Sequence, residues 1–169
     1  MTRIAAGLLA ALTWAGAQPL PVPSFKQQKN GCGAASVAMV MHYWSARLPG
    51  APASPQPAEV YRRLYDEQLR GIPLARMKRY LENSGFLAYT FHGRWSDIEQ
   101  QLGKGRPVIV SLKKRPSSAM HYAVVTCILA DRILLNDPSK RGGQSMKRPA
   151  FEKQWSQADG WMLLAAPRE

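Results

Sequence analysis

The sequence predicts an α+β fold, with helices in the first half and an antiparallel sheet in the second, in a single domain over residues 18–169. Three observations predict it. The run 34–44 is apolar and rich in Ala and Met, which suits a buried helix. The stretches 121–129 and 132–138 are rich in strand-forming residues and lie close together, which indicates a hairpin. A chain of 169 residues that is 46% hydrophobic is sufficient for one core.

The first 17 residues have the pattern of an export signal. Arg3 supplies a positive start, an apolar run extends from Ile4 to Trp14, and Ala15-Gly16-Ala17 is a small-residue cleavage site. The apolar run is too short to span a bilayer. We therefore expect cleavage before Gln18 and export to a bacterial periplasm or to the medium, with an uncleaved anchor as the alternative.

The helical half is predicted to contain three helices. The first begins at Cys32 and extends to about Ala46, and a loop with four prolines in nine residues follows over 49–57. Two further helices are expected over 58–69 and 74–83, because their apolar residues recur at helical spacing. Gly71-Ile72-Pro73 separates these two helices.

The second half is predicted to build the sheet. Strands are expected over 86–91, over the apolar run 107–112 in the centre of the sheet, and over 161–166. Between the first two, Ser96 is expected to cap a short helix, with Glu99 completing a capping box. The segment after Pro138 contains Gly142-Gly143 and is expected to be a moving loop, followed by a short helix over 151–155.

Cys32 is the first candidate for chemistry. It lies between Gly31 and Gly33 at the start of the predicted helix, where unpaired N–H groups and the helix dipole favour negative charge. A thiol in that place is expected to ionise readily, and the thiolate is the nucleophilic form. Gln27 and Gln28 precede it by five and four residues. The alternative is a small cysteine buried in a core helix.

The predicted hairpin could bring His121 and Asp137 together. A turn centred near Leu129 or Ala130 would place both residues on the same face, about 5–8 Å apart at their Cβ atoms. A two-residue turn at Ala130-Asp131 would place them on opposite faces unless a bulge intervenes. A Cys-His-Asp triad therefore requires one particular register.

Three segments resemble the bacteriocin-processing, double-glycine leader cysteine peptidases, a papain-like family. They are Val22-Pro23-Ser24-Phe25-Lys26-Gln27 with Cys32-Gly33-Ala34-Ala35, then His121-Tyr122-Ala123-Val124-Val125, then Leu134-Leu135-Asn136-Asp137-Pro138. The resemblance implies a helical half packed on an antiparallel sheet half, with the site between them. The sequence departs from the family in that no transporter domain follows, so we expect a free-standing member, and its N-terminal pattern predicts an exported one.

The resemblance implies a role for each matching residue. Cys32 resembles the nucleophile, His121 the base, Asp137 the residue that orients the base, and Gln27 the oxyanion-hole donor, with Gln28 as the rival for that last role. It implies hydrolysis of a peptide or protein substrate, after small residues such as Gly-Gly or Gly-Ala. The alternatives are acyl transfer or amide hydrolysis on the same triad, and a catalytically silent binding module for an acidic or secreted peptide.

Basic residues are concentrated in two loops beside the predicted site. Lys113, Lys114 and Arg115 precede His121, and Lys140 and Arg141 follow Asp137. With a formal net charge of +12, they are expected to bind acidic peptide substrates, although a merely solvated surface or weak contact with an anionic membrane is the alternative. The chain contains no recognisable nucleic-acid motif, and export removes most such partners.

No cofactor or metal is expected, because His42, His92 and His121 are scattered along the sequence and do not form a ligand set. Cys127 is the only other cysteine. Six residues of strand separate it from His121, roughly 20 Å, whereas a disulfide requires Cα atoms within about 7 Å. If Cys32 contacts His121, both thiols are therefore expected to be free.

Overall fold

The structure is a computed structural model that describes residues 18–113 and 119–168. The expected export signal (1–17) and the basic residues Lys114 and Arg115 lie outside the described residues. The helices and strands, in chain order, are α1 (Cys32–Arg47), α2 (Pro57–Leu64), α3 (Leu74–Asn83), β1 (Phe86–His92), α4 (Trp95–Gly103), β2 (Val108–Leu112), β3 (His121–Leu129), β4 (Arg132–Asn136), β5 (Gly143–Lys147), α5 (Arg148–Ser156) and β6 (Trp161–Pro167).

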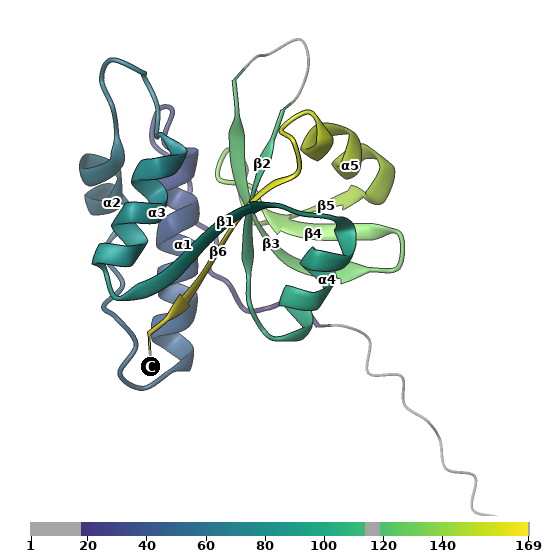
Figure 1. Cartoon of the computed structure of the whole chain (residues 1–169), viewed down its shortest axis with the longest axis horizontal. Coiled ribbons are helices and arrows are strands. Elements are labelled where there is room, and N and C mark those ends of the chain that lie inside the picture. The colour runs from purple at the N-terminus through teal and green to yellow at the C-terminus, as the bar shows by residue number, and fades with distance from the viewer. Residues whose placement is uncertain (1–17, 114–118, 169) are drawn as a thin grey trace, which may run out of the picture.

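The six strands form one antiparallel sheet in the order β1-β6-β2-β3-β4-β5. Helices α1, α2 and α3 cover one side of this sheet, and α4 and α5 lie on the other (Figure 1). The predicted α+β class is therefore confirmed, and β2 is central as expected, between β6 and β3. No helix in the described ranges is long and apolar enough to cross a membrane.

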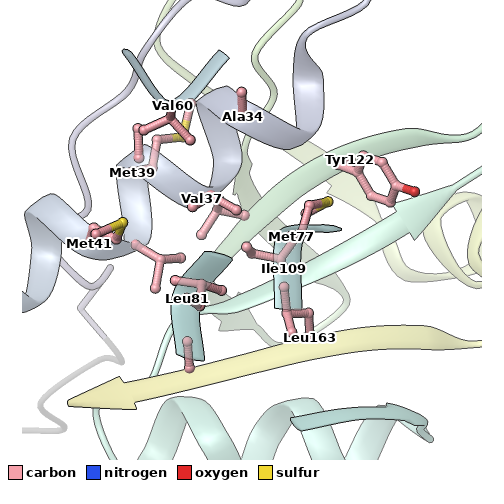
Figure 2. Close-up of a cluster of buried hydrophobic side chains, with 14 of the residues drawn as sticks. Ala34, Val37, Met39, Met41, Val60, Met77, Leu81, Ile109, Tyr122 and Leu163 are labelled. Carbon is pink, nitrogen blue, oxygen red and sulfur yellow. The ribbon is translucent and has the colours of Figure 1, made fainter. Parts of the chain in front are cut away.

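The larger core lies between α1 and the sheet. Twelve of the sixteen residues of α1 are buried, which explains why its sequence is apolar almost throughout and not only on one face. Figure 2 shows Val37 of α1 meeting Met77 and Leu81 of α3, with Ile109 and Leu163 beneath them from two strands of the sheet. This packing fixes the position of α1, and with it the position of Cys32 at its first residue.

A second core fills the opposite side of the sheet. Trp95 and Ile98 of α4 and Phe151 and Trp155 of α5 are buried there against alternate residues of β2, β3 and β4. Because both faces of the central strands are covered, β2 is buried along its whole length, which explains its sequence, apolar except for Ser111.

The β3–β4 hairpin has a two-residue turn at Ala130-Asp131, because Leu129 pairs with Arg132. By itself, this turn would place His121 and Asp137 on opposite faces of the sheet. Of the two turns that the sequence left open, the structure therefore has the one that requires a bulge.

That bulge is present at Thr126. The register shifts by one residue there, so that Val124 pairs with Asn136 beyond it. Beyond the bulge, an odd-numbered residue of β3 pairs with an odd-numbered residue at the end of β4 and shares its face of the sheet. His121 and Asp137 are both odd-numbered, so they lie diagonally on the same face. The bulge is thus the feature that allows the two side chains to meet.

The helix predicted over 58–69 is too long, since α2 ends at Leu64. Asp66 is the reason. Its carboxylate accepts hydrogen bonds from the backbone N–H groups of Gln68 and Leu69, which competes with helical bonding. Residues 66 and 71 form an isolated antiparallel bridge instead, and Arg76 of α3 forms an ion pair with Asp66 at 2.7 Å.

Two further predictions in the second half are wrong. Helix α4 begins at Trp95, one residue before the expected cap Ser96, and its capping carboxylate is Asp97, which accepts the N–H of Arg94. Glu99 instead accepts the indole N–H of Trp95. The segment expected to be a moving loop contains β5, which pairs with β4 along all five residues, so its polar sequence reflects an exposed edge strand.

The residues after the expected cleavage point lie against the sheet as an extended segment. The N–H of Leu20 donates to the carbonyl of Thr126, the bulge residue. The side-chain amide of the buried Asn136 donates to the carbonyls of Val22 and Pro23. These bonds hold the chain that leads to Gln27 and Cys32 beside the end of β4.

We predict that Met77→Ala lowers the free energy of unfolding by about 2–5 kcal/mol, because Met77 is fully buried between α1 and the sheet. Urea unfolding followed by circular dichroism measures this. Met120→Ala is the matched control, since Met120 is 39% exposed, and its effect should stay within about 0.5 kcal/mol. Equal losses in the two variants would contradict the described packing.

Candidate active site

Cys32, His121 and Asp137 come together where the first residue of α1 faces the start of β3 and the end of β4. The Nε2 atom of His121 lies 2.6 Å from Oδ1 of Asp137. The imidazole of His121 also forms a hydrogen bond with the side chain of Cys32. Because Nε2 faces the carboxylate, Nδ1 is the ring nitrogen that faces the sulfur.

This contact alters the protonation of both partners of the ion pair. Burial lowers the pKa of His121, but hydrogen bonds and charge from Asp137 and Cys32 outweigh it and raise that pKa to about 9. Burial raises the pKa of Asp137, but hydrogen bonds from His121 and Ser139 lower it to about 2. At neutral pH the pair is therefore an imidazolium and a carboxylate.

Gln27, and not Gln28, lies in the cleft with Cys32. Gln27 is half-buried and lines the same cleft as Cys32, whereas the exposed Gln28 lines a separate hollow beside Ala34 and α2. The N–H of Gln27 donates to the carbonyl of Pro138 at 2.9 Å. The structure thus joins the segment before the cysteine directly to the turn that follows Asp137.

The cleft has a volume of about 660 Å³. Its walls come from both halves of the fold, so it lies between the helical half and the sheet, as the resemblance implied. The lining residues are Gln27, Asn30, Cys32, Leu69, Arg70, Gly71, Ile72, Pro73, Ala119, Met120, His121 and Tyr122.

Leu69, Arg70 and Met120 are among the lining residues that sequence reasoning missed. Leu69 and Met120 are 69% and 39% exposed, and they line the cleft from the segment before α3 and the segment before β3. Arg70 lies next to Leu69 and has a positive φ of 51°, a conformation that a non-glycine residue seldom adopts. The proline at 73 and glycine at 71 marked this segment as a break, but the predicted helix over 58–69 hid its role.

None of the five basic residues expected around the site is found among the described residues that line the cleft. Lys113, Lys140 and Arg141 are not among the residues that line the cleft, and Lys114 and Arg115 lie outside the described residues. Among the described lining residues, Arg70 is the one Lys or Arg, and no Asp or Glu lines the cleft.

Cys32 and Cys127 form no disulfide, as expected. Cys127 is buried in β3, and burial raises the pKa of its thiol. His42 bonds the carbonyl of Pro55, and His92 bonds the carbonyl of Asp159, both away from the cleft. Within the part of the chain that the structure describes, no group of three or more His, Cys, Asp or Glu side chains is placed to hold a metal ion.

Comparison with known proteins identifies similar folds and one matching family. The Peptidase_C39 like family matches residues 19–161. The peptidase domain of Streptococcus ComA, a bifunctional ABC transporter of a quorum-sensing pathway, has 18% identity and a TM-score of 0.67, covering 86% of this chain and 98% of that one. No curated protein sequence matches significantly.

Two further solved structures are equally similar. A double-glycine motif protease from an AMS/PCAT transporter, in complex with its leader peptide, has 20% identity and a TM-score of 0.67, with 92% of this chain and 96% of that chain covered. A C39-like peptidase from Bacillus anthracis has 14% identity and the same TM-score, with 88% and 96% covered. At these identities the likeness establishes the fold: a papain-like peptidase fold.

We predict that His121→Asn slows alkylation of Cys32 by iodoacetamide at pH 5–7 by about tenfold or more, because the imidazolium that faces the sulfur is lost. The raised pKa of His121 keeps the imidazole protonated up to about pH 9, so the difference should be present below that pH and vanish above it, where the imidazole of the wild type has lost its charge. Mass-spectrometric mapping of alkylation against pH measures both effects. If Cys32 of the wild type is still alkylated faster than that of His121→Asn, by the same factor, at pH 10, this explanation is contradicted.

Proposed function

Because the chain belongs to the Peptidase_C39 like family, we propose that it is a cysteine peptidase that hydrolyses peptide bonds with Cys32, His121 and Asp137. The observation that carries the proposal is the contact of a cysteine at a helix N-terminus with a histidine whose far nitrogen bonds a carboxylate at 2.6 Å. This is the arrangement that nucleophilic catalysis requires: a nucleophile, a base within reach of it, and a group that orients the base.

In the proposed reaction, the Cys32 thiolate attacks the peptide carbonyl carbon and forms the S–C bond. The imidazolium of His121 gives its proton to the leaving amine as the C–N bond breaks, which leaves a thioester. His121 then accepts a proton from a water molecule, whose oxygen attacks the thioester. The C–S bond breaks, which releases the carboxylic acid and restores the Cys32 thiolate beside the His121 imidazolium. Asp137 holds the imidazole in one tautomer and stabilises its charged form throughout.

The oxyanion that forms during attack is proposed to bind the backbone N–H of Cys32 and the side-chain amide of Gln27. The N–H groups of the first turn of a helix have no intrahelical acceptor, so that of Cys32 is suited to this role. Gln27 lines the cleft beside the sulfur, which supports it over Gln28. One such donor contributes on the order of 3 kcal/mol to lowering the barrier in other enzymes.

We propose peptide substrates that are cut after small residues, such as Gly-Gly or Gly-Ala, and that carry an acidic residue near the cut. The first feature is supported by the similar fold of a double-glycine motif protease that binds a leader peptide. The second is supported by Arg70, a cationic residue that lines the cleft, whereas no Asp or Glu of the described residues lines it. An acidic side chain in the substrate would complement that charge.

Cys32→Ala is expected to lower cleavage of a fluorogenic peptide library by a factor on the order of 10³ or more, because the nucleophile is removed. Cys127→Ala is the matched control and should retain nearly full activity, since Cys127 is buried in the sheet and does not line the cleft. Cleavage by Cys32→Ala at the wild-type rate would refute the peptidase assignment. Binding of peptides by a wild type that cleaves none would instead support a binding module.

Arg70→Glu is expected to reverse the preference between peptides with Asp and with Lys near the cut, by about two- to fivefold for each, as an exposed charge pair permits. Ratios of kcat/KM for the two peptides measure the preference, and it should weaken at high salt. Arg79→Glu is the control, because Arg79 is exposed on α3 and lines a different hollow. Equal shifts in both variants would show that net charge alone is responsible.

A further inference from the structure

Ser139 lies directly against the carboxylate that holds His121. Its hydroxyl donates to Oδ1 of Asp137 at 2.7 Å, and its backbone N–H donates to the same oxygen at 2.8 Å. His121 donates from Nε2 to that oxygen as well, at 2.6 Å. A single carboxylate oxygen therefore accepts three hydrogen bonds, two of them from one serine.

We propose that Ser139 is a positioning residue that acts through Asp137: its hydroxyl fixes the orientation of the carboxylate so that Oδ1 points at His121. This proposal rests on the proposed function, since it concerns the same site. Ser139 does not itself line the cleft, so it would not touch substrate. Neither the family match nor the resemblance of the sequence assigns it a role.

The backbone N–H and the hydroxyl of Ser139 have different roles at Asp137. The backbone N–H closes a turn on the side chain of Asp137, while the N–H of Lys140 donates to the backbone carbonyl of Asp137 at 2.9 Å, so the main chain of the turn is already held. The hydroxyl adds a second, nearly equidistant donor to Oδ1. Together with Nε2 of His121, both donors of Ser139 hold this one oxygen in place.

The hydroxyl also favours the charged form of the carboxyl. Although burial opposes ionisation, the hydrogen bonds from His121 and from both donors of Ser139 lower the pKa of Asp137. The titratable groups that face this carboxyl are His121 from β3 and, through His121, Cys32 from α1. Lys140, the next charged residue along the turn, is exposed.

Loss of the hydroxyl should therefore affect the acidic side of the pH profile. Without it, Asp137 takes up a proton at higher pH, and the imidazolium of His121 then loses its counter-ion. Both kcat/KM and the rate of Cys32 alkylation fall as the pH is lowered through this protonation. This acid limb of the two profiles should move to higher pH. A serine that merely stabilised the turn would lower the thermal stability without moving this limb.

The test compares wild type, Ser139→Ala, Ser139→Thr and Ser156→Ala for peptide cleavage and for alkylation of Cys32 by iodoacetamide, from pH 1 to pH 9, a range that includes the pKa of Asp137 at about 2. Ser139→Ala should shift the acid limb upward by about half a pH unit or more and lower kcat several-fold, with KM unchanged. Ser139→Thr keeps the hydroxyl and should restore the wild-type profile. Ser156 donates to a backbone carbonyl at the end of α5 and should tolerate alanine.

The alkylation profile does not depend on any substrate, so the two proposals can fail separately. A Ser139→Ala profile that overlays the wild type overturns the role of Ser139. If the wild type cleaves no peptide but the alkylation profile of Ser139→Ala is shifted relative to it, the peptidase function is overturned and the positioning role stands. A limb that shifts equally in Ser156→Ala overturns the assignment to Ser139.

Discussion

The bulge at Thr126 is the constraint on which the site depends. The two-residue turn at Ala130-Asp131 sets a register that separates His121 from Asp137 across the sheet, and one extra residue in β3 reverses this. The same residue is used a second time, because its carbonyl accepts the N–H of Leu20. The bulge therefore both aligns the two side chains and anchors the segment that leads to the cysteine.

The four residues 136–139 connect every part of the site. Asn136 holds the extended N-terminal segment, Asp137 holds His121, and the carbonyl of Pro138 accepts the N–H of Gln27. Ser139 completes the turn by bonding Asp137. Two of these contacts reach back more than a hundred residues to the N-terminal segment, one joins the ends of the β3–β4 hairpin, and one lies within the turn. The short sequence Asn-Asp-Pro-Ser therefore fixes the relative positions of the cysteine, the histidine and the glutamine.

The wall of the cleft opposite β3 is built by an interrupted helix. Asp66 competes for backbone N–H groups after α2 ends, and its ion pair with Arg76 ties the resulting loop to α3. Leu69 and Arg70 therefore face the cleft and are not part of a helix surface. The positive φ of Arg70 is a local strain that the bridge between residues 66 and 71 supports.

The sequence by itself determined the class of fold, the helix that begins at Cys32, the central strand β2 and the free state of both thiols, because each follows from periodicity or from spacing along the chain. It also identified the residues that meet in the site, through their resemblance to a family. The tertiary structure alone decided the register that joins His121 to Asp137, the choice of Gln27 over Gln28 in the cleft, and the lining by Leu69, Arg70 and Met120. Those features arise from a bulge, a side chain that competes with a helix, and contacts between distant segments. Local propensity does not encode them, since their energies depend on partners that only folding brings near.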